Sequence, residues 1–440
     1  MTKDELKGKI ISAISLGCDK NKVDLEKMLG QLKEYGFTIT DEVESADIVI
    51  VNTCAFIQPA QEEAIMNILA MEKLKDSGRI EKIIVTGCFP ERNYNSFKEN
   101  FPKIDAYLKL SENDTICQTI EKLYGLEPSK PIKKYERVLT NSPSYAYLKI
   151  ADGCDNVCSY CTIPRIRGRY KSYPIDDLVD EAKNLVSRGV KEIILVAQDP
   201  TRYGEDLYKE NCLIKLCEKL SKIKGLLSIR LHYAYPEKVS DELLDYISKN
   251  EKMCKYLDMP LQHIDDELLK SMRRKLDEEA TRALLDKIKT NYPEIALRST
   301  FIVGYPGENR SQFKKLYNFI KETRFDYAGF FPYSREPNTA SYFMKKQVPN
   351  IIKKMRLHKI TKLQNQIAKE KALELVGQTI EVLVDSFDSQ TWEFLAHSKK
   401  MSPLVDFNVR FVDNGNVECY TFVQVKIKDF DGSDYIGEVV

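Results

Sequence analysis

Short runs rich in isoleucine and valine alternate with amphipathic helical patterns through most of this chain. In the first part these strand-like runs are 10–17, 46–53 and 82–87. Six more follow, at 145–150, 192–197, 228–234, 255–260, 297–304 and 326–334. Such alternation favours parallel sheets covered by helices. We therefore predict an α/β fold, with an N-terminal parallel sheet domain over residues 1–130 and a partial barrel of six β/α units over 140–373.

Two segments depart from this pattern. Residues 126–144 contain three prolines and have no clear period, which indicates an interdomain connection. Residues 350–377 indicate one long basic helix, and residues 374–440 contain β-branched and alternating runs. These runs predict a small C-terminal antiparallel β-barrel of about five strands.

The composition restricts the class of protein. A chain of 440 residues suggests roughly three domains. With 43% hydrophobic residues, 30% charged residues and a net charge of +1, disorder is excluded and general nucleic-acid binding gains no support. No apolar stretch approaches a membrane span and no signal-peptide core is visible, so we expect a cytoplasmic protein without membrane contact. The 11 cysteines are then expected to be reduced, and clustered ones indicate metal, redox or catalytic chemistry.

The most specific motif is a loop of three cysteines directly after a predicted strand. Cys154, Cys158 and Cys161 have the spacing C-x3-C-x2-C. Cysteine thiolates hold cubane iron–sulfur clusters, and three of them leave the fourth iron open for catalysis. The alternative is a zinc knot, which needs a fourth ligand, but the next cysteine is Cys212.

This spacing, with the aromatic Tyr160 before the last cysteine, resembles the radical S-adenosylmethionine (SAM) superfamily. The resemblance implies that the open iron binds the amino and carboxylate groups of SAM, that SAM is cleaved to a 5′-deoxyadenosyl radical, and that Tyr160 lies by the adenine. Other candidates for SAM binding stand at predicted strand ends or on a strand. They are Gln198, Asp199, Gln262, Arg298 and Gly304. For each of them, a polar or backbone role at the barrel rim is the equally weighted alternative.

A second set of cysteines is dispersed in the sequence. Cys18, Cys54 and Cys88 each follow a predicted strand of the N-terminal domain. Adjacent parallel strands lie about 4.8 Å apart, so their carboxyl ends converge on one sheet edge, where α/β sheets place ligands. We predict a second cluster there. The alternative is that they are buried packing residues.

The segments around both sets resemble the methylthiotransferase family over essentially the whole chain. They are SLGCDKNKVDLE, ADIVIVNTCAFI, VTGCFPER and GCDNVCSYCTIPRIRG, followed by a small C-terminal barrel. The resemblance implies a methylthiotransferase domain, a radical SAM domain and a TRAM domain, the last over 374–440. It also implies an auxiliary [4Fe-4S] cluster on Cys18, Cys54 and Cys88, and thus two clusters in all. The other cysteines are read as packing residues: Cys117, Cys212, Cys217, Cys254 and Cys419.

Within that family the wording resembles the branch that modifies an aspartate of small-subunit ribosomal protein S twelve. The segments include IPRIRGRYKS, AQDPTRYGEDLY and LDMPLQHIDDELLKSMRRK. Residues 374–440 contain five basic and twelve acidic residues, a net charge of −7, which would repel tRNA and attract a basic protein. Two segments depart from the family pattern. One is Lys171-Ser172-Tyr173 after the cluster loop, and the other, in the tail, contains His397, Ser402, Leu404 and Phe407.

The implied reaction begins with hydrogen abstraction from the β-carbon of that aspartate by the deoxyadenosyl radical. The carbon radical then takes sulfur from the auxiliary cluster, and a second SAM supplies the methyl group. A reductant such as flavodoxin or ferredoxin is implied. The stretch 345–373 has a net charge of +8, which fits either contact with ribosomal RNA or a solvated helix face. For the oligomeric state, a monomer is the default expectation.

Three alternatives remain at this point. One is a tRNA adenosine methylthiotransferase, which belongs to the same family. Another is a non-catalytic iron–sulfur redox sensor or ribosome-binding factor, which would not cleave SAM. The third is a radical SAM enzyme without an auxiliary cluster, which would hold about four irons per chain rather than about eight.

Overall fold

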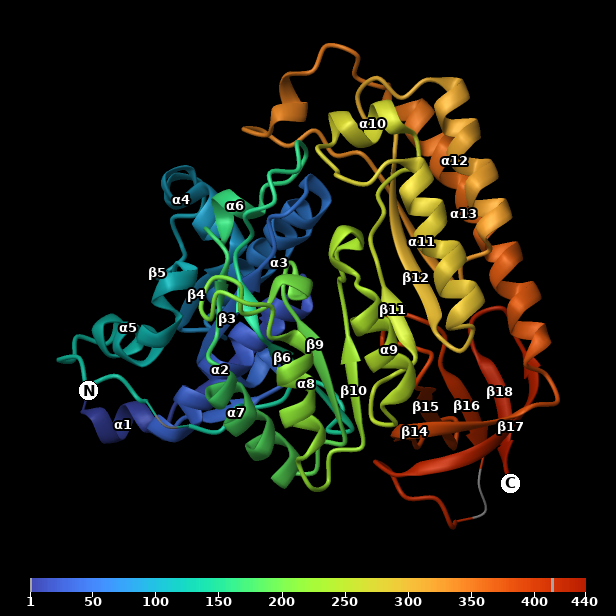
Figure 1. The fold of residues 1–440 in the computed structure, drawn as a ribbon. Coiled ribbons are helices and arrows are strands. Elements are labelled where there is room, and N and C mark those ends of the chain that lie inside the picture. The colour runs from blue at the N-terminus through green and yellow to red at the C-terminus, as the bar shows by residue number, and fades with distance from the viewer. Residues whose placement is uncertain (1, 134, 413–414) are drawn as a thin grey trace. The chain divides into compact units, whose positions relative to one another are not determined.

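The computed structural model describes residues 2–133, 135–412 and 415–440, and the side chains of all of these except 93–96. The chain divides into two compact units (Figure 1). Unit 1 comprises Met1–Thr140, Gly153–Asp155 and Cys161–Arg169, and unit 2 comprises Asn141–Asp152, Asn156–Tyr160 and Tyr170–Val440. Within the described ranges, no helix combines the length and apolarity that crossing a membrane requires.

Unit 1 contains a five-stranded parallel sheet in the order β2-β1-β3-β4-β5. Its strands are β1 (Ile10–Ser15), β2 (Thr38–Thr40), β3 (Ile48–Thr53), β4 (Lys82–Gly87) and β5 (Ala106–Tyr107). Its helices are α1 (Lys3–Lys7), α2 (Asp19–Tyr35), α3 (Gln58–Asp76), α4 (Cys88–Asn100), α5 (Ile116–Leu123) and α6 (Ile163–Ile166). The predicted parallel sheet is confirmed, with two edge strands that sequence reasoning missed because they are only three and two residues long.

The sheet of unit 1 is buried on both faces because its central strands β3 and β4 contain uninterrupted Ile/Val runs at 48–51 and 83–85. Val49 and Val85 belong to one buried cluster, whereas Ile50 and Ile84 belong to another on the opposite face. Successive side chains of a strand point to opposite faces, so a continuous Ile/Val run fills both layers. The carboxyl edge of the sheet is thereby held between helix layers.

Unit 2 contains the predicted partial barrel. Its parallel strands are β6 (Tyr145–Lys149), β9 (Glu192–Val196), β10 (Ser228–Leu231), β11 (Tyr256–Asp258), β12 (Ala296–Val303) and β13 (Tyr327–Pro332). They form two three-stranded sheets, β10-β9-β6 and β11-β12-β13, joined by an isolated bridge between Ile229 and Met253. The short strands β7 (Ala151–Asp152) and β8 (Lys171–Ser172) form a separate antiparallel pair.

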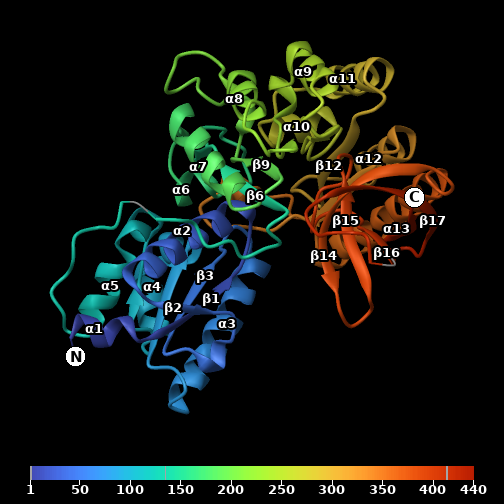
Figure 2. The same ribbon diagram turned by 90° about the horizontal axis from the view of Figure 1, so that it is seen from below.

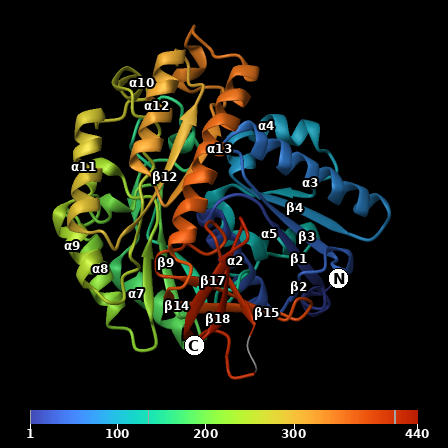
Figure 3. The ribbon, with the colours of Figure 1, turned by 90° about the vertical axis from the view of Figure 1, so that its right-hand side faces the viewer.

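Helices separate the barrel strands. They are α7 (Ile175–Ser187), α8 (Leu213–Ser221), α9 (Asp241–Lys249), α10 (Asp266–Ser271), α11 (Glu278–Asn291) and α12 (Arg310–Thr323). The predicted long basic helix is α13 (Asn350–Glu374), which packs on β13 and α12 (Figure 3). Short 3₁₀ turns complete the chain at Val43–Ser45, Leu110–Thr115, Pro200–Arg202, Pro236–Lys238 and Ala340–Phe343.

The C-terminal part of unit 2 is a closed five-stranded barrel in the order β14-β15-β16-β18-β17. Its strands are β14 (Thr379–Asp388), β15 (Glu393–Ser398), β16 (Val409–Val412), β17 (Phe422–Phe430) and β18 (Tyr435–Val439). Four of its pairings are antiparallel, as predicted, but β16 and β18 pair in parallel. This parallel contact closes the ring of strands.

Strands β14 and β15 form a hairpin (Figure 2), and aromatic side chains lie at its tip. Phe387 and Phe394 pack with ring centroids 4.9 Å apart, and Phe387 also contacts Trp392 at 5.9 Å. Trp392 is 70% exposed, and its backbone N–H donates to the carbonyl of Asp388 at 2.8 Å. The turn therefore presents an ordered indole to solvent.

Buried charges fix the closed barrel to the partial barrel inside unit 2. His397 of β15 lies 2.7 Å from Asp385 of β14 and 3.3 Å from Glu192 of β9. Arg230 of β10 pairs with Glu192 at 2.7 Å and donates to the carbonyl of Ser398. All these groups are buried, and each has a partner of opposite charge or a hydrogen-bond partner within the network.

Candidate functional site

The three dispersed cysteines of unit 1 follow adjacent strands and meet at the carboxyl edge of the sheet. Cys18 follows β1, Cys54 follows β3 and Cys88 follows β4. Gly17 has φ +96°, and a Cβ on it would lie 2.7 Å from the Cβ of Cys54. Gly87 has φ +95°, and a Cβ on it would lie 2.4 Å from the carbonyl oxygen of Thr53. Two glycines thus allow the strand ends to approach closely enough to bring the cysteines together.

Asn21, in the first turn of α2, ties these strand ends to one another. Its side-chain amide donates to the carbonyls of Leu16, at 2.9 Å, and Thr53, at 3.0 Å. Its Oδ1 lies 3.9 Å from the Sγ of Cys88. One buried amide therefore contacts the segments that carry all three cysteines.

Of the three thiols, that of Cys88 is buried and those of Cys18 and Cys54 are half-buried, and one cation lies beside them. Burial is the main cause that raises the pKa of Cys54 and raises that of Cys88 to about 12, and the charge of Arg167 opposes it in both. The Nη2 of Arg167 lies 3.9 Å from the Sγ of Cys88 and 3.0 Å from both Asn21 and Asp24. Thiols with raised pKa values still lose their protons when they bind iron, because the positive charge of the metal stabilises the thiolate.

The donor set fits a cluster better than a single ion. Among the described residues, no three Cys, His, Asp or Glu side chains are arranged to hold one metal ion. A cubane takes each cysteine on a different iron, so its ligands need not converge on one point. Close strand ends, thiol-only donors and a neighbouring guanidinium suit a cubane with three protein ligands.

The three cysteines of the loop motif are divided between the two units. Cys154 and Cys161 belong to unit 1. The backbone N–H of Cys154 donates to the carbonyl of Gly168 at 3.1 Å. The hydroxyl of Thr162, next to Cys161, donates to the carbonyl of Phe56 at 3.3 Å. The segment with Cys161 therefore packs on the loop that carries Cys54.

Cys158 belongs to unit 2, where a tyrosine contacts it. Its Sγ lies 2.9 Å from the hydroxyl of Tyr235. The guanidinium of Arg274 lies over the Tyr235 ring, 4.1 Å from its centroid, and donates to the carbonyl of Pro260 at 3.0 Å. Burial is the largest cause that raises the pKa of Tyr235 above the usual value for tyrosine.

Of the predicted SAM-binding residues, Asp199 lines a cavity together with this tyrosine, and Gln198 precedes Asp199 in the chain. Asp199 accepts from Thr201 at 2.6 Å and from Asn156, in the cysteine loop, at 2.8 Å. It is buried, and burial raises its pKa. A cavity of about 130 Å³ is lined by Asn156, Asp199 and Tyr235 among others. Gln198, the other one, donates weakly to Asp152 at 3.5 Å.

The remaining candidates have varied surroundings. Tyr160 contacts the ring of Tyr305 edge-on, with centroids 6.5 Å apart. Gln262 has φ +72°, and Gly304 has φ +73° with its N–H donating to Glu308. Each of these stays a prediction as a cofactor-binding residue.

Arg298, near the amino-terminal end of β12, pairs with carboxylates rather than lying beside the cysteines. It pairs with Asp406, from the loop before β16, at 2.6 Å and lies 3.9 Å from Asp258. Its side chain is 19% exposed. In this structure its charge holds the closed barrel in place, and its SAM-binding role stays a prediction.

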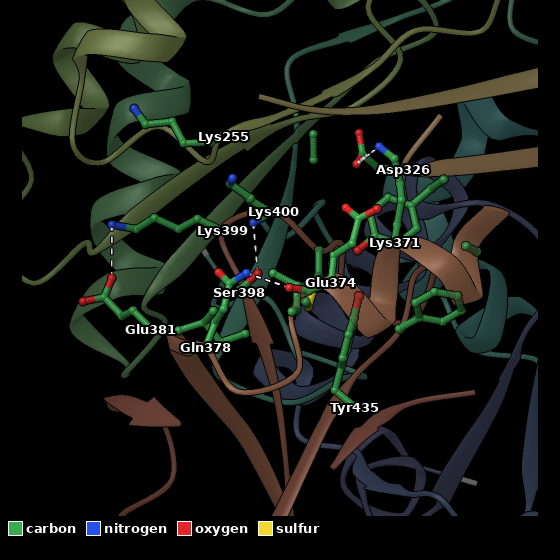
Figure 4. A pocket seen from close by; sticks show the side chains of 17 residues that line it. Lys255, Asp326, Lys371, Glu374, Gln378, Glu381, Ser398, Lys399, Lys400 and Tyr435 are labelled. Carbon is green, nitrogen blue, oxygen red and sulfur yellow. Dashed lines mark hydrogen bonds and ion pairs between the residues drawn. The ribbon is translucent and has the colours of Figure 1, made fainter. Parts of the chain in front are cut away.

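A larger cavity, of about 450 Å³, lies at the opposite end of the partial barrel (Figure 4). Its lining includes Lys255, Ala296 and Asp326, which stand at the amino-terminal ends of β11, β12 and β13. Lys371 pairs there with Asp326 at 2.6 Å. Chemistry in β/α barrels takes place at the carboxyl ends of the strands, so this cavity is not the candidate active site.

Sequence reasoning missed four residues that contact the cysteines or their neighbours: Asn21, Arg167, Tyr235 and Arg274. Two of them carry a local signal. Asn21 follows Cys18 by three residues and Arg167 follows Cys161 by six, within the quoted motifs. The other two lie far from any cysteine in the sequence.

Three families match successive parts of the chain. Residues 11–109 match the uncharacterized protein family UPF0004, residues 148–320 the radical SAM superfamily and residues 376–440 the TRAM domain. Two solved structures share the fold at low sequence identity. The methyltransferase TsrM from Kitasatospora setae has TM-score 0.55 at 15% identity, over 76% of this chain and 77% of that one. The cobalamin-dependent enzyme OxsB has TM-score 0.51 at 14% identity, over 81% and 57%.

Curated relatives match over nearly the full length. The protein from Alkaliphilus oremlandii is 40% identical over 432 residues, 98% of each chain. The protein from Thermoanaerobacter is 41% identical over 441 residues, 98% of this chain and 100% of that one. The protein from Geotalea uraniireducens is 42% identical over 440 residues, 98% of each chain. All three are called ribosomal protein uS12 methylthiotransferase RimO.

Proposed function

We propose that this chain, which belongs to the RimO family of ribosomal protein uS12 methylthiotransferases, adds a methylthio group to the β-carbon of an aspartate of uS12. We take the activity to use two [4Fe-4S] clusters and SAM. The domains are 1–130 for the auxiliary cluster, 140–373 for the radical SAM chemistry and 374–440 for the TRAM barrel. Because the substrate is ribosomal, we place the reaction in the cytoplasm.

The residues assigned to each cluster are the two cysteine sets. Cys154, Cys158 and Cys161 would hold the SAM-binding cluster, while the auxiliary one takes Cys18, Cys54 and Cys88. When bound, the first supplies the electron for SAM cleavage and the second supplies sulfur. An unactivated carbon cannot be functionalised by ordinary acid–base groups, so the protein side chains position the reactants.

The convergence of the dispersed cysteines carries this proposal. Cys18, Cys54 and Cys88 come together at one sheet edge of unit 1 through Gly17 and Asn21. In the same unit the Cys161 segment packs on the loop after Cys54. Sulfur insertion needs a second sulfur-bearing group besides the SAM-binding cluster, and the convergence of these three thiols within unit 1 supports that assignment.

The charge of the closed barrel supports a protein substrate over tRNA. Residues 374–440 carry a net charge of −7, whereas a module that grips RNA needs basic groups for phosphate contacts. An acidic surface instead favours a basic ribosomal protein by electrostatic complementarity. We also propose flavodoxin or ferredoxin as the reductant.

The test is a reaction in which both substrate classes are offered. Full-length protein, reconstituted without oxygen, is incubated with SAM, dithionite, small ribosomal subunits and tRNA, and the products are read by mass spectrometry. We expect a methylthio group on uS12 and none on tRNA. Modified adenosine in tRNA with unmodified uS12 would replace the proposal by the tRNA activity. SAM cleavage by protein with about four irons and without any methylthio product would reject sulfur insertion.

A further inference from the structure

Arg167 lies at the auxiliary cysteine site although it comes from the segment after the radical SAM motif. Its side chain is 1% exposed and its Nη2 lies 3.0 Å from both the Oδ1 of Asn21 and the Oδ2 of Asp24. The same nitrogen lies 3.9 Å from the Sγ of Cys88. A buried guanidinium is always charged, so the site contains a permanent positive charge.

We propose that Arg167 is a positioning residue of the auxiliary cluster, an inference that rests on the proposed function. It holds α2, which follows Cys18, against Cys88 through Asn21 and Asp24. Its charge also compensates the negative charge that three thiolates and a reduced cluster bring into an apolar site. Nearby charge is one of the factors that set the reduction potential of iron–sulfur clusters.

The contacts explain why an arginine stands at this position. Three groups from two segments share one guanidinium nitrogen, and a planar fork with five N–H donors suits such shared contacts. Asn21, which Arg167 orients, donates to the carbonyls of Leu16 and Thr53 beside the other two cysteines. Arg167 therefore acts on Cys88 directly and on the other strand ends through one amide.

The charge predicts a direction for the reduction potential. A positive charge near a cluster stabilises its reduced form by Coulomb attraction, more strongly in a buried site than in water. Removing it should make the midpoint potential of the auxiliary cluster more negative. Replacing it by lysine keeps the charge and should restore most of the potential while loosening the geometry.

The test uses the full chain with Cys154→Ala, so that only the auxiliary cluster gives a signal. Midpoint potentials are read by redox titration with electron paramagnetic resonance. Arg167→Met is expected to keep about four irons and to shift the potential negatively, Arg167→Lys to stay near the parent, and Arg165→Met to leave it unchanged. Arg165 is the matched control because it lies in α6, two residues before Arg167 at the helix C-cap, carries the same charge and is exposed.

Two outcomes need separation. Should Arg167→Met fail to fold because Asp24 loses its ion pair, Arg167→Gln removes the charge and keeps an N–H donor for Asp24. Equal potentials in the parent, the methionine or glutamine variant and the lysine variant would overturn the inference and leave Arg167 a merely structural residue. A parent protein that binds no iron under Cys154→Ala would instead contradict the proposed auxiliary cluster itself.

Discussion

The cysteine site of unit 1 and the ionic network of unit 2 both gather polar groups from distant parts of the sequence, yet they differ in completeness. In the network, His397 contacts two carboxylates and Arg230 pairs with one of them. In the cysteine site, burial raises the pKa values of Cys54 and Cys88, and one guanidinium lies beside the thiols.

This difference separates a structural cluster from a functional one. Buried polar groups that satisfy one another stabilise a single arrangement of the fold. Three buried or half-buried thiols that converge at the carboxyl edge of a sheet do not satisfy one another, and their convergence is explained by a ligand that binds there. Changes in the first cluster should thus affect stability, and changes in the second should affect cofactor content.

The largest effect is expected from removing one cysteine ligand from each of the two cysteine sets and comparing the two variants. Cys154→Ala should abolish SAM cleavage and keep the auxiliary cluster. Cys54→Ala should keep cleavage and abolish methylthio transfer. Release of 5′-deoxyadenosine under dithionite and mass spectrometry of uS12 measure the two steps. Full methylthio transfer by Cys54→Ala would show that the second site is assigned wrongly.

Gly87→Ala should affect both stability and cofactor content of unit 1. Gly87 has φ +95° and ψ −156°, a region that is essentially restricted to glycine, and an added Cβ would overlap Thr53. We expect the free energy of unfolding to fall by about 3 kcal/mol and the chain to bind fewer irons. Thermal unfolding and iron analysis measure both. Gly78→Ala is the control, since Gly78 also has positive φ but no atom lies within 4 Å of its Cβ position.

His397→Gln should cost stability without changing iron content. Asp385 and Glu192 raise the pKa of His397 to about 9 against the effect of its burial. A raised pKa contributes stability that is fully present below about 6.5 and lost as the pH rises through about 9, here about 3 kcal/mol. The free energy of unfolding of the wild type should therefore decrease over this pH range more steeply than that of His397→Gln. The exposed His358→Gln serves as control, and parallel pH profiles of all three would reject the role of this network.

The smallest effect is expected for Cys117→Ala. Cys117 is buried among apolar residues of unit 1, away from the strand ends. Removing its sulfur should cost about 1 kcal/mol and leave the iron content and product yield unchanged. A loss of iron in this variant would mean that cofactor content reports folding of unit 1 in general rather than the identity of the ligands.

The positions of Cys18, Cys54 and Cys88 at the ends of strands were predictable from the sequence because the signal for each is local. A buried Ile/Val run that ends in Gly-Cys or Thr-Cys specifies both the strand and the position of the thiol. The contacts of Arg298 with Asp406 and of His397 with Glu192 were not predictable, because they join residues 108 and 205 positions apart in a barrel whose docking no local pattern encodes. The parallel pairing of β16 with β18 was missed for the same reason.

The hairpin tip of the closed barrel carries the only source of tryptophan fluorescence in the chain. Trp392 is the single tryptophan among 440 residues, and it stands largely in water on an ordered turn. Indole emission therefore originates from one known point, remote in sequence from every assigned cysteine. Without any label, its shift or quenching would report directly what approaches this tip during encounters with a ribosomal subunit.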